Sequence, residues 1–462
     1  MQFIKNAFLL SVIVLLSNLA SAQTDGVDSY LVRQMQKNHV PAISVAIVRN
    51  GKIEKLKSYG VANIEWDVTA TPDSAFQIAS TTKPFTGVLL MRLVEQGKIS
   101  LDDPVTKHIP TGPESWKQIT VRHLATHSSG LSDAYPTEKI KTADEAIQAA
   151  AKLPLAYTPG SRSAYGLTDF VVLARIMENV SGRSFPALLA EQILNPLGLF
   201  STRFSNAVEN GPLRVSDAVP RRVATYRWSA AAQQVAEYLY PQWTYAAGGL
   251  FSSAADLARF AVALDEGPLL KTSSLDAMWQ RPKLSDGSQG DFAIGWTART
   301  YRGRKTVGHS GGPALSDMIR FVDDKLTIIV LTNQQKLFPA LAEGVADIIA
   351  PGPVPERKAI PDDDPVLSAS LRSVIEGMAD GRFNDELFTP EARKQLVPAL
   401  REFGPQLIGF YDTLKSFTLV EQKRESNRTI RKYRAMYGTK PVLWTLVIGD
   451  DRRIISMEPV SE

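Results

Sequence analysis

The stretch that decides the fold of this chain is STTKPFTGVLLMRL, residues Ser80–Leu93. It contains the one place in the sequence where a lysine follows a serine by three positions, Ser80 and Lys83. Apolar residues after Pro84 recur near every third or fourth position, which predicts a helix with Pro84 in its first turn. On such a helix start the two side chains lie one turn apart on one face, near the positive end of the helix dipole. A hydroxyl beside an amine is the smallest set of groups that activates a serine without histidine, so the stretch predicts nucleophilic catalysis.

The composition is that of an ordinary globular protein. The 462 residues suffice for two or three domains, with 44% hydrophobic and 22% charged residues. The net charge of +4 is small for this length, and no block of lysine and arginine follows the pattern of a nucleic-acid-binding segment. The expected partner is therefore a small-molecule or peptide substrate and not nucleic acid. We expect no cofactor and no metal, and the sequence leaves the oligomeric state open.

The first 22 residues predict a signal peptide that is cleaved. Lys5 precedes the apolar run Ala7–Leu16, and Ala20-Ser21-Ala22 forms a small-residue cleavage pattern before Gln23. The run is shorter than the roughly 20 apolar residues that a membrane span needs, and no later segment is long enough. The chain has no cysteine, which excludes disulfides and lipid attachment at an N-terminal cysteine. These features predict an exported protein, periplasmic or secreted, without a stable membrane span.

Strand patterns at both ends of the first 350 residues enclose a mostly helical middle. A hairpin is predicted at residues 41–60, with Asn50-Gly51 as its two-residue turn. Residues 81–270 read as helices joined by loops. Further strands are predicted at Phe292–Trp296, Thr306-Val307 and Met318–Leu331. One sheet closed by distant segments accounts for this order, which predicts an α+β fold with many long-range contacts.

A second, smaller domain is predicted after a linker. Residues 351–364 are rich in proline and charge, so we place the first domain at 23–350 and the second at 365–462. The second domain opens with helical stretches at Val366–Ala379 and Pro390–Phe403, followed by a strand meander. About 100 residues are enough for a core of its own. The meander strands are predicted at Ser416–Gln422, Thr429–Tyr437, Val442–Ile448 and Ile454–Pro459.

Two more segments carry groups that an activated serine needs. A Pro159-Gly160 turn delivers Tyr165 just before a helix, where a phenol can pass a proton between nucleophile and leaving group. The segment Val307–Gly312, VGHSGG, reads as a strand running into a glycine-rich turn that contains His309. The backbone N–H of Gly312 can face an oxyanion there. Taken alone, the first segment also fits an ordinary loop tyrosine. The second also fits a tight turn with a surface histidine.

The chain resembles the serine β-lactamase and penicillin-binding protein superfamily in three motifs that follow one another in the same order. They are Ser80-x-x-Lys83, a tyrosine after Pro-Gly, and His309-x-Gly311. The chain looks most similar to the class C-like serine hydrolases, which include esterases, D-aminopeptidases and D-alanyl-D-alanine carboxypeptidases. The resemblance covers roughly residues 25–350. The similar connecting phrases are Gln77-Ile78-Ala79, Leu93–Pro104, Ile119–Leu131, Asn195–Leu199 and Ala246–Leu250.

The resemblance implies a β-lactamase-like fold, with an antiparallel sheet flanked by helices and a mostly helical subdomain. It implies an acyl-enzyme mechanism in which Ser80 attacks a carbonyl, neutral Lys83 takes its proton and Tyr165 relays a proton to the leaving group. The substrates would be esters, amides or D-amino-acid peptides. The C-terminal domain resembles cystatin-like or nuclear-transport-factor-like modules. The residues that the resemblance assigns to substrate binding or the oxyanion are His309, Gly311 and Gly312, the oxyanion being held by the N–H groups of Ser80 and Gly312.

Two positions depart from the family pattern. The second motif usually carries asparagine two residues after the tyrosine, where this chain has Leu167, so an amide that would hold substrate and tune the lysine is missing. Either Asp169 or another residue substitutes, or substrate binding differs. The third motif has His309 where true β-lactamases and penicillin-binding proteins favour lysine. Both changes argue against efficient β-lactam hydrolysis and leave acyl transfer intact.

Other interpretations compete with this one. Gly308–Gly312 fits the Gly-x-Ser-x-Gly elbow of α/β-hydrolases, but that fold needs a histidine after the serine and none follows here. His123 and His127 have zinc-ligand spacing without a third ligand, so structural roles are expected. Glu191 and Ser132-Asp133 echo class A motifs, and we interpret neither as functional. The remaining rival is a catalytically silent cell-wall peptide-binding or sensor protein on the same scaffold.

Overall fold

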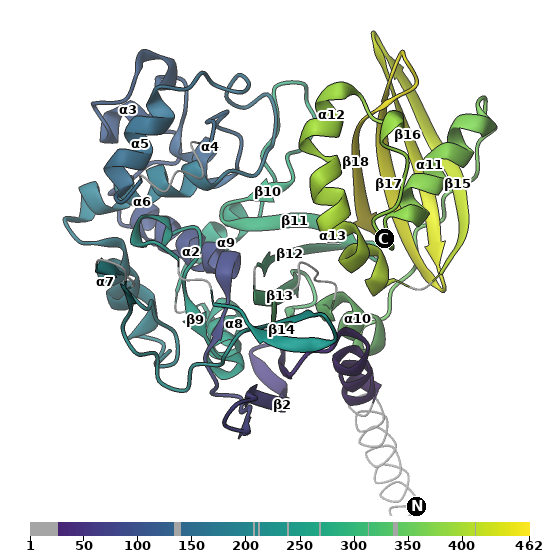
Figure 1. The fold of residues 1–462 in the computed structure, drawn as a ribbon. Helices are drawn as coiled ribbons and strands as arrows, with labels where there is room; N and C mark the ends of the chain where they lie inside the picture. The colour runs from purple at the N-terminus through teal and green to yellow at the C-terminus, as the bar shows by residue number, and fades with distance from the viewer. Residues whose placement is uncertain are drawn as a thin grey trace, which may run out of the picture. The chain divides into compact units, whose positions relative to one another are not determined.

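The computed structural model describes residues 26–462 apart from 134–139, 207, 211–212, 238–239, 268, 313, 336–340 and 412. The predicted signal peptide, residues 1–22, lies outside the described residues. The chain forms two compact units (Figure 1). The first contains the chain up to Arg299 together with Lys305–Ala350, and the second contains Thr300–Arg304 and Pro351–Glu462.

The first unit is built around an antiparallel sheet with the strand order β10-β11-β12-β13-β14-β1-β2-β3. Strand β1 (Ala42–Arg49) pairs with β14 (Leu326–Gln335), so that segments from the two ends of the unit lie side by side. This arrangement confirms the predicted α+β fold class and its closure by distant strands. The other strands of this path are β2 (Lys52–Asn63), β3 (Val68–Thr69), β10 (Phe292–Ala293), β11 (Trp296–Tyr301), β12 (Arg304–Gly311) and β13 (Ala314–Phe321).

The hairpin between β1 and β2 has the turn that its sequence predicts. Asn50 and Gly51 have φ angles of 50° and 73°, both in the left-handed region. A two-residue turn with two positive φ angles matches the twist of the flanking strands, and asparagine followed by glycine adopts it at the least cost. The register of β1 against β2 is thereby fixed close to the turn, with Arg49 opposite Lys52.

Helices cover the sheet and carry the nucleophile segment. Helix α8 (Ala254–Glu266) packs on β1 and β14, and α10 (Leu341–Ile349) packs on β13 and β14. Helix α2 (Lys83–Glu95) is buried along most of its length, and Phe85 stacks on Phe260 of α8 at 4.1 Å between ring centroids. Residues 26–38 are also helical. Further helices of this unit are α3 (Val105–His108), η2 (Glu114–Trp116), α4 (Val121–Ala125), α5 (Ala143–Ala151), α6 (Leu167–Ser181), α7 (Phe185–Leu189), η3 (Ala190–Leu194), η4 (Gln242–Thr244) and α9 (Thr272–Met278).

The middle of the chain is mostly helical, as predicted, but it also contains short strand pairs that the sequence analysis missed. Each runs for two to four residues, too short for an alternating pattern to stand out in the sequence. Their pairing partners are set by the tertiary fold: β4 just before Ser80 pairs with β9. The pairs are β4 (Phe76–Gln77) with β9 (Phe251–Ser252), β5 (Val208–Asn210) with β6 (Leu213–Val215), and β7 (Tyr226–Ser229) with β8 (Ala232–Val235).

The second unit holds an antiparallel sheet in the order β15-β16-β17-β18 with its own helices and core. Tyr433 and Trp444 are fully buried in that core. The single helical stretch predicted at Pro390–Phe403 is two helices, because Pro398 lacks an N–H and suits the first turn of a new helix. The elements are α11 (Pro365–Gly377), η5 (Asp385–Leu387), α12 (Pro390–Gln395), α13 (Val397–Phe410), β15 (Leu414–Glu425), β16 (Arg428–Tyr437), β17 (Lys440–Gly449) and β18 (Ile454–Ser461).

Candidate active site

Ser80 lies in a single 3-10 turn, η1 (Ala79–Thr82), immediately before α2. The regular helix begins at Lys83, with Pro84 in its first turn as predicted. In a 3-10 turn residues three apart are eclipsed, which keeps the two side chains together. Lys83 Nζ donates to Ser80 Oγ at 3.2 Å. Ala79, just before the serine, has a left-handed φ of 47°, a strained conformation of the kind that clusters at functional sites.

The amine of Lys83 is buried, with 1% of the residue exposed, and three oxygen atoms surround it. Besides Ser80 Oγ, it donates to the carbonyl oxygen of Ala247 at 2.7 Å and to the hydroxyl of Tyr165. These three acceptors match the three N–H groups of an ammonium. A neutral amine has two N–H groups and a lone pair, so loss of one proton frees the amine to accept the proton of Ser80.

Tyr165 completes a triangle of polar groups. Its hydroxyl donates to Ser80 Oγ at 2.9 Å and accepts from Lys83 Nζ. Although its hydroxyl is held between two partners, the residue is 48% exposed, so part of it faces solvent. The structure thus brings together Ser80, Lys83 and Tyr165, as the sequence predicts, whereas their catalytic roles stay predictions.

His309 lies within β12 and is buried, so the interpretation as a surface histidine in a tight turn is wrong. Its Nδ1 lies 2.8 Å from the carbonyl oxygen of Ser310. A carbonyl oxygen only accepts, so Nδ1 carries the proton and Nε2 has a lone pair. Burial, and then the charge of Lys83, lowers the pKa of His309 to about 3. The imidazole is therefore neutral near pH 7, and its ring centroid lies 6.1 Å from that of Tyr165.

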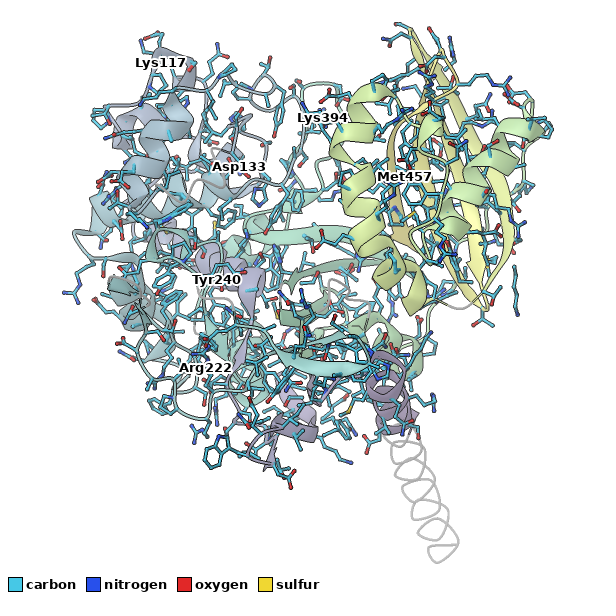
Figure 2. The ribbon with its side chains drawn as sticks, viewed as in Figure 1. Lys117, Asp133, Arg222, Tyr240, Lys394 and Met457 are labelled. Carbon is cyan, nitrogen blue, oxygen red and sulfur yellow. The ribbon has the colours of Figure 1, made fainter. Side chains whose placement is uncertain are left out.

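Gly311 allows β12 to lie directly against the turn that carries the nucleophile. A Cβ added at Gly311 would sit 2.1 Å from the carbonyl oxygen of Ile78 and 3.0 Å from Cβ of Ala79. Any side chain would push the strand away, so this position needs glycine. The end of the strand is held in turn by Tyr240, which is labelled in Figure 2. Its hydroxyl donates to the carbonyl oxygen of Gly312 at 2.7 Å.

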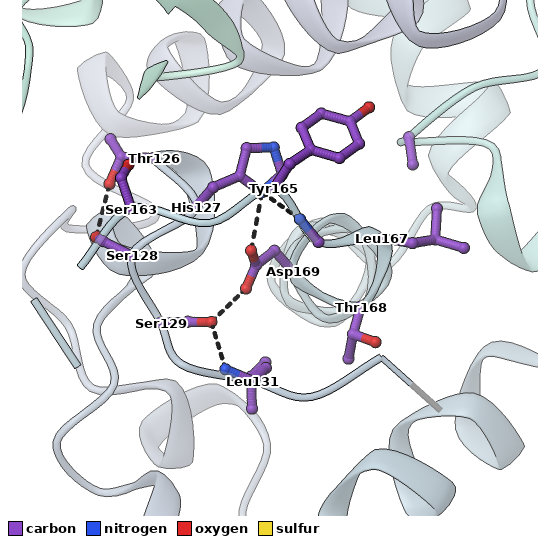
Figure 3. Close-up of polar contacts among 12 residues, drawn as sticks. Thr126, His127, Ser128, Ser129, Leu131, Ser163, Tyr165, Leu167, Thr168 and Asp169 are labelled. Atoms are coloured by element: carbon purple, nitrogen blue, oxygen red, sulfur yellow. Dashed lines mark hydrogen bonds and ion pairs between the residues drawn. The ribbon is translucent and has the colours of Figure 1, made fainter. Parts of the chain in front are cut away.

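The segment behind Tyr165 contains a buried polar cluster that the sequence analysis did not assemble. His127 Nδ1 lies 2.9 Å from Asp169 Oδ2, and Ser129 donates to Asp169 Oδ1 (Figure 3). Burial lowers the pKa of His127 well below its ordinary value. Burial also raises the pKa of Asp169 well above its ordinary value. Asp169 is only 3% exposed and bonded within this cluster, so it is not a substrate-facing replacement for the missing amide. Leu167 is partly buried against the hydrophobic core.

The other motif-like residues have structural partners. His123 Nδ1 accepts the backbone N–H of Thr120 as part of a helix cap, and Glu191 pairs with Arg183 at 3.3 Å. Asp133, labelled in Figure 2, accepts the first two N–H groups of α6. Within the described ranges, no three His, Cys, Asp or Glu side chains lie together in a way that could hold a metal ion.

Sequence reasoning missed two contributions to the site. The carbonyl of Ala247 belongs to a phrase that looked family-like, but a backbone acceptor leaves no trace in residue type. A structural role is expected for His127 from the sequence, and its packing against the ring of Tyr165, at 4.6 Å between centroids, puts it beside the site. The spacing of His127 and Asp169 carries no signal, because 42 residues separate them.

With this geometry in view, comparison with known proteins decides the family. A family model described as Beta-lactamase matches residues 27–349. The chain belongs to the Beta-lactamase family. This confirms the resemblance seen in the sequence. The solved D-amino acid amidase from Ochrobactrum anthropi SV3 shares the fold, with a TM-score of 0.58 and 23% identity over 71% of this chain and 96% of that one.

Two curated relatives show how far the similarity of this Beta-lactamase family member extends. Protein Flp of Staphylococcus aureus strain MRSA252 is 26% identical over 334 residues, 69% of this chain and 64% of that protein. Penicillin-binding protein 4* of Bacillus subtilis strain 168 is 28% identical over 339 residues, 68% of this chain and 74% of that protein. The chain thus spans less than two thirds of the length of the first of these. The family model and these relatives agree on the Beta-lactamase family, and the solved amidase shares its fold.

Proposed function

We propose that this chain is an exported serine hydrolase that cleaves ester or amide bonds, D-amino-acid peptides among them, through an acyl-enzyme on Ser80. The observation that carries the proposal is the double contact to Ser80 Oγ, from Lys83 Nζ at 3.2 Å and from Tyr165 Oη at 2.9 Å. A serine hydroxyl with a base and a relay in hydrogen-bond reach meets the geometric requirement for an activated nucleophile.

In the acylation step, Ser80 Oγ forms a bond to the substrate carbonyl carbon while its proton passes to neutral Lys83. The carbonyl oxygen becomes an oxyanion that the backbone N–H groups of Ser80 and Gly312 stabilise. Tyr165 gives its proton to the leaving alcohol or amine and recovers one from Lys83, to which it is hydrogen-bonded. Water then attacks the acyl carbon, with Lys83 or Tyr165 as base, and restores the serine.

The charge of the site favours substrates that are uncharged next to the scissile bond. The third motif presents a neutral histidine, since burial lowers the pKa of His309 to about 3, and the second motif presents Leu167 instead of an amide. Neither offers the positive charge or amide that would recognise a carboxylate beside the reacting carbonyl. Simple esters and amides are therefore proposed as better substrates than β-lactams.

Export of the protein is part of the proposal and rests on the N-terminal sequence, with Lys5, the run Ala7–Leu16 and the Ala20-Ser21-Ala22 cleavage pattern. Among the helices that the structure describes, none is both long and apolar enough to cross a bilayer. A periplasmic or secreted location is consistent with a small-molecule or peptide substrate.

The test is labelling with a fluorophosphonate probe, together with hydrolysis of a p-nitrophenyl ester, in the wild type, Ser80→Ala and Lys83→Ala. We expect both variants to lose hydrolysis and Ser80→Ala to lose labelling. Hydrolysis retained by either variant overturns the assignment of that residue. A folded wild type that neither labels nor hydrolyses short esters, D-amino-acid p-nitroanilides or nitrocefin would support a silent binding or sensor protein instead.

A further inference from the structure

His127 holds the chain on both sides of Tyr165. Its backbone carbonyl accepts the N–H of Ala164 at 2.8 Å, and its ring nitrogen Nδ1 accepts the N–H of Gly166 at 3.3 Å. The imidazole also packs against the ring of Tyr165, at 4.6 Å between centroids (Figure 3). One residue therefore fixes the two backbone neighbours and one ring face of the tyrosine whose hydroxyl reaches Ser80.

The directions of the hydrogen bonds around His127 determine where the protons are. The N–H of Leu131 donates to Ser129 Oγ at 2.9 Å, so the Ser129 hydroxyl hydrogen is free to bond to Asp169 Oδ1, its acceptor in the structure. On the other side, the Gly166 N–H points at His127 Nδ1, which must therefore carry a lone pair. A proton on Nδ1 would set two N–H groups against each other.

The Gly166 contact favours one assignment of the contact between Nδ1 and Asp169 Oδ2, at 2.9 Å, although His127 Nε2 is then a buried donor without a hydrogen-bond partner among the described residues. Since Nδ1 is an acceptor, the proton between the two atoms belongs to Oδ2, and Asp169 is a neutral carboxylic acid. The proton of the neutral imidazole is on Nε2. From this we propose that His127 and a protonated Asp169 form a neutral hydrogen-bonded pair that positions Tyr165 against Ser80 and Lys83.

The surroundings favour a neutral pair over an ion pair. His127 is 1% and Asp169 3% exposed, and both ionised forms lose hydration on burial. The charged neighbours act in both directions: Lys83 disfavours an imidazolium and favours a carboxylate, whereas Asp133 does the reverse. The Ser129 hydrogen bond also favours the carboxylate, and burial is the largest influence on both groups. Burial accordingly raises the pKa of Asp169 and lowers that of His127, the directions that a neutral pair requires.

The pair has a positioning role and not a catalytic one, since neither side chain bonds to Ser80, Lys83 or the Tyr165 hydroxyl in the contacts described. It also explains how the tyrosine stays in place although Leu167 offers no amide. Leu167 carries no polar side-chain atom, so the orientation of Tyr165 depends on its own backbone neighbours and on the ring beside it. This inference rests on the proposed function, in which Tyr165 relays a proton.

Two substitutions at Asp169 separate the neutral acid from an ion pair. In Asp169→Asn the amide oxygen can still accept from Ser129 and the amide N–H can still donate to His127 Nδ1, as the protonated acid does. We expect this variant to keep kcat for a p-nitrophenyl ester within about tenfold of wild type, with an unchanged pH profile. In Asp169→Ala both bonds are lost, and we expect kcat to fall about 100-fold with KM little changed, since misplacing a catalytic group by an ångström costs about that much.

A matched control is Asp256→Ala, which removes another buried aspartate from the first turn of a helix. Asp256 bonds to Ser201, Thr202 and Arg259 and has no role in the proposed mechanism. Its loss should lower the melting temperature while kcat per folded molecule changes little. The comparison separates positioning of Tyr165 from general loss of stability.

The protonation of Asp169 can also be read without activity, as the infrared carbonyl band of a neutral carboxylic acid that is present in wild type and absent from Asp169→Asn. A missing band overturns the neutral pair, and so does an Asn variant as impaired as the Ala variant. A folded Asp169→Ala with wild-type kcat overturns the positioning role. If instead Ser80→Ala keeps hydrolysis while the band is present, the proposed function fails and the neutral pair stands.

Discussion

In the Ser80–Lys83 segment the two side chains are three residues apart and meet across one helical turn, whereas Tyr165 comes from 85 residues further along the chain to reach the same oxygen. The first contact needs only the local backbone of η1 and α2. The second needs the loop before α6 to be held by hydrogen bonds to His127 and by packing on its ring. Local structure therefore places the nucleophile Ser80 and the proposed base Lys83. The proposed proton relay, Tyr165, depends on contacts with His127 from another part of the fold.

The largest expected effect tests the local half of the site. Lys83→Arg keeps a positive charge, but a guanidinium has no lone pair to accept the proton of Ser80. We expect kcat/KM for a p-nitrophenyl ester to fall about 10³–10⁴-fold, the upper range for loss of a general base. Melting temperature and circular dichroism check that the buried site tolerates the larger side chain. Activity within tenfold of wild type would mean that charge, and not proton transfer, is what Lys83 supplies.

A smaller loss is expected on the long-range side. Tyr165→Phe keeps the ring that packs on His127 and removes the hydroxyl between Ser80 and Lys83. We expect kcat to fall about 100-fold with an intact fold, because Lys83 still contacts Ser80 directly. The loss should be greater for an amide than for an activated ester, since an amine leaving group needs the relayed proton more. An equal loss for both substrates would contradict the relay.

A substitution in β12, the strand that contains the third motif, is expected to reduce activity by an intermediate amount. A methyl group at Gly311 would meet the carbonyl oxygen of Ile78, so Gly311→Ala should shift β12 away from the nucleophile turn. We expect kcat/KM to fall about tenfold, together with a lower melting temperature. Gly267→Ala is the control, since Gly267 has a φ of 80° and open space around its Cα. That variant should lose about 1 kcal/mol of stability and keep its activity.

The smallest expected effect is the contribution of His309 to the pH dependence of the free energy of unfolding. Its folded pKa of about 3 lies below the ordinary value of 6.5, so the unfolded state binds the proton more readily between these values. Stability from the neutral imidazole is therefore present above pH 6.5 and lost as pH falls toward 3, by up to about 1.4 kcal/mol per pH unit. The pKa values of His127 and Asp169 shift in opposite directions, so their contributions to the slope have opposite signs.

Urea midpoints between pH 7 and pH 4 should accordingly fall more steeply for wild type than for His309→Asn, which has no titrating ring. Gly267→Ala provides a comparison, because it removes no titrating group and should leave the slope as it is in wild type. Equal slopes for wild type and His309→Asn would mean that the imidazole is charged in the folded protein or exposed to water.

Much of the fold was visible in the sequence because the relevant signals are local. The Asn50-Gly51 turn, the strands of the C-terminal sheet and the helix after Lys83 all follow from spacing and turn chemistry. The short pairs β4–β9 and β7–β8 were not visible, since two to four residues carry no reliable period. The break before Pro398 was missed because only Leu396 separates α12 from α13, so the two helices look like one in the sequence.

By itself the sequence determined that a serine and a lysine would stand one turn apart, because residues three apart in a helical turn share a face whatever surrounds them. It also determined the family, through the order of three short motifs. Only the tertiary structure decided that Tyr165 meets both groups, that His309 is buried and neutral, and that Asp169 is buried against His127. Those facts depend on which distant segments pack together and on how much water they exclude. The spacing of residues along the chain does not determine either of them.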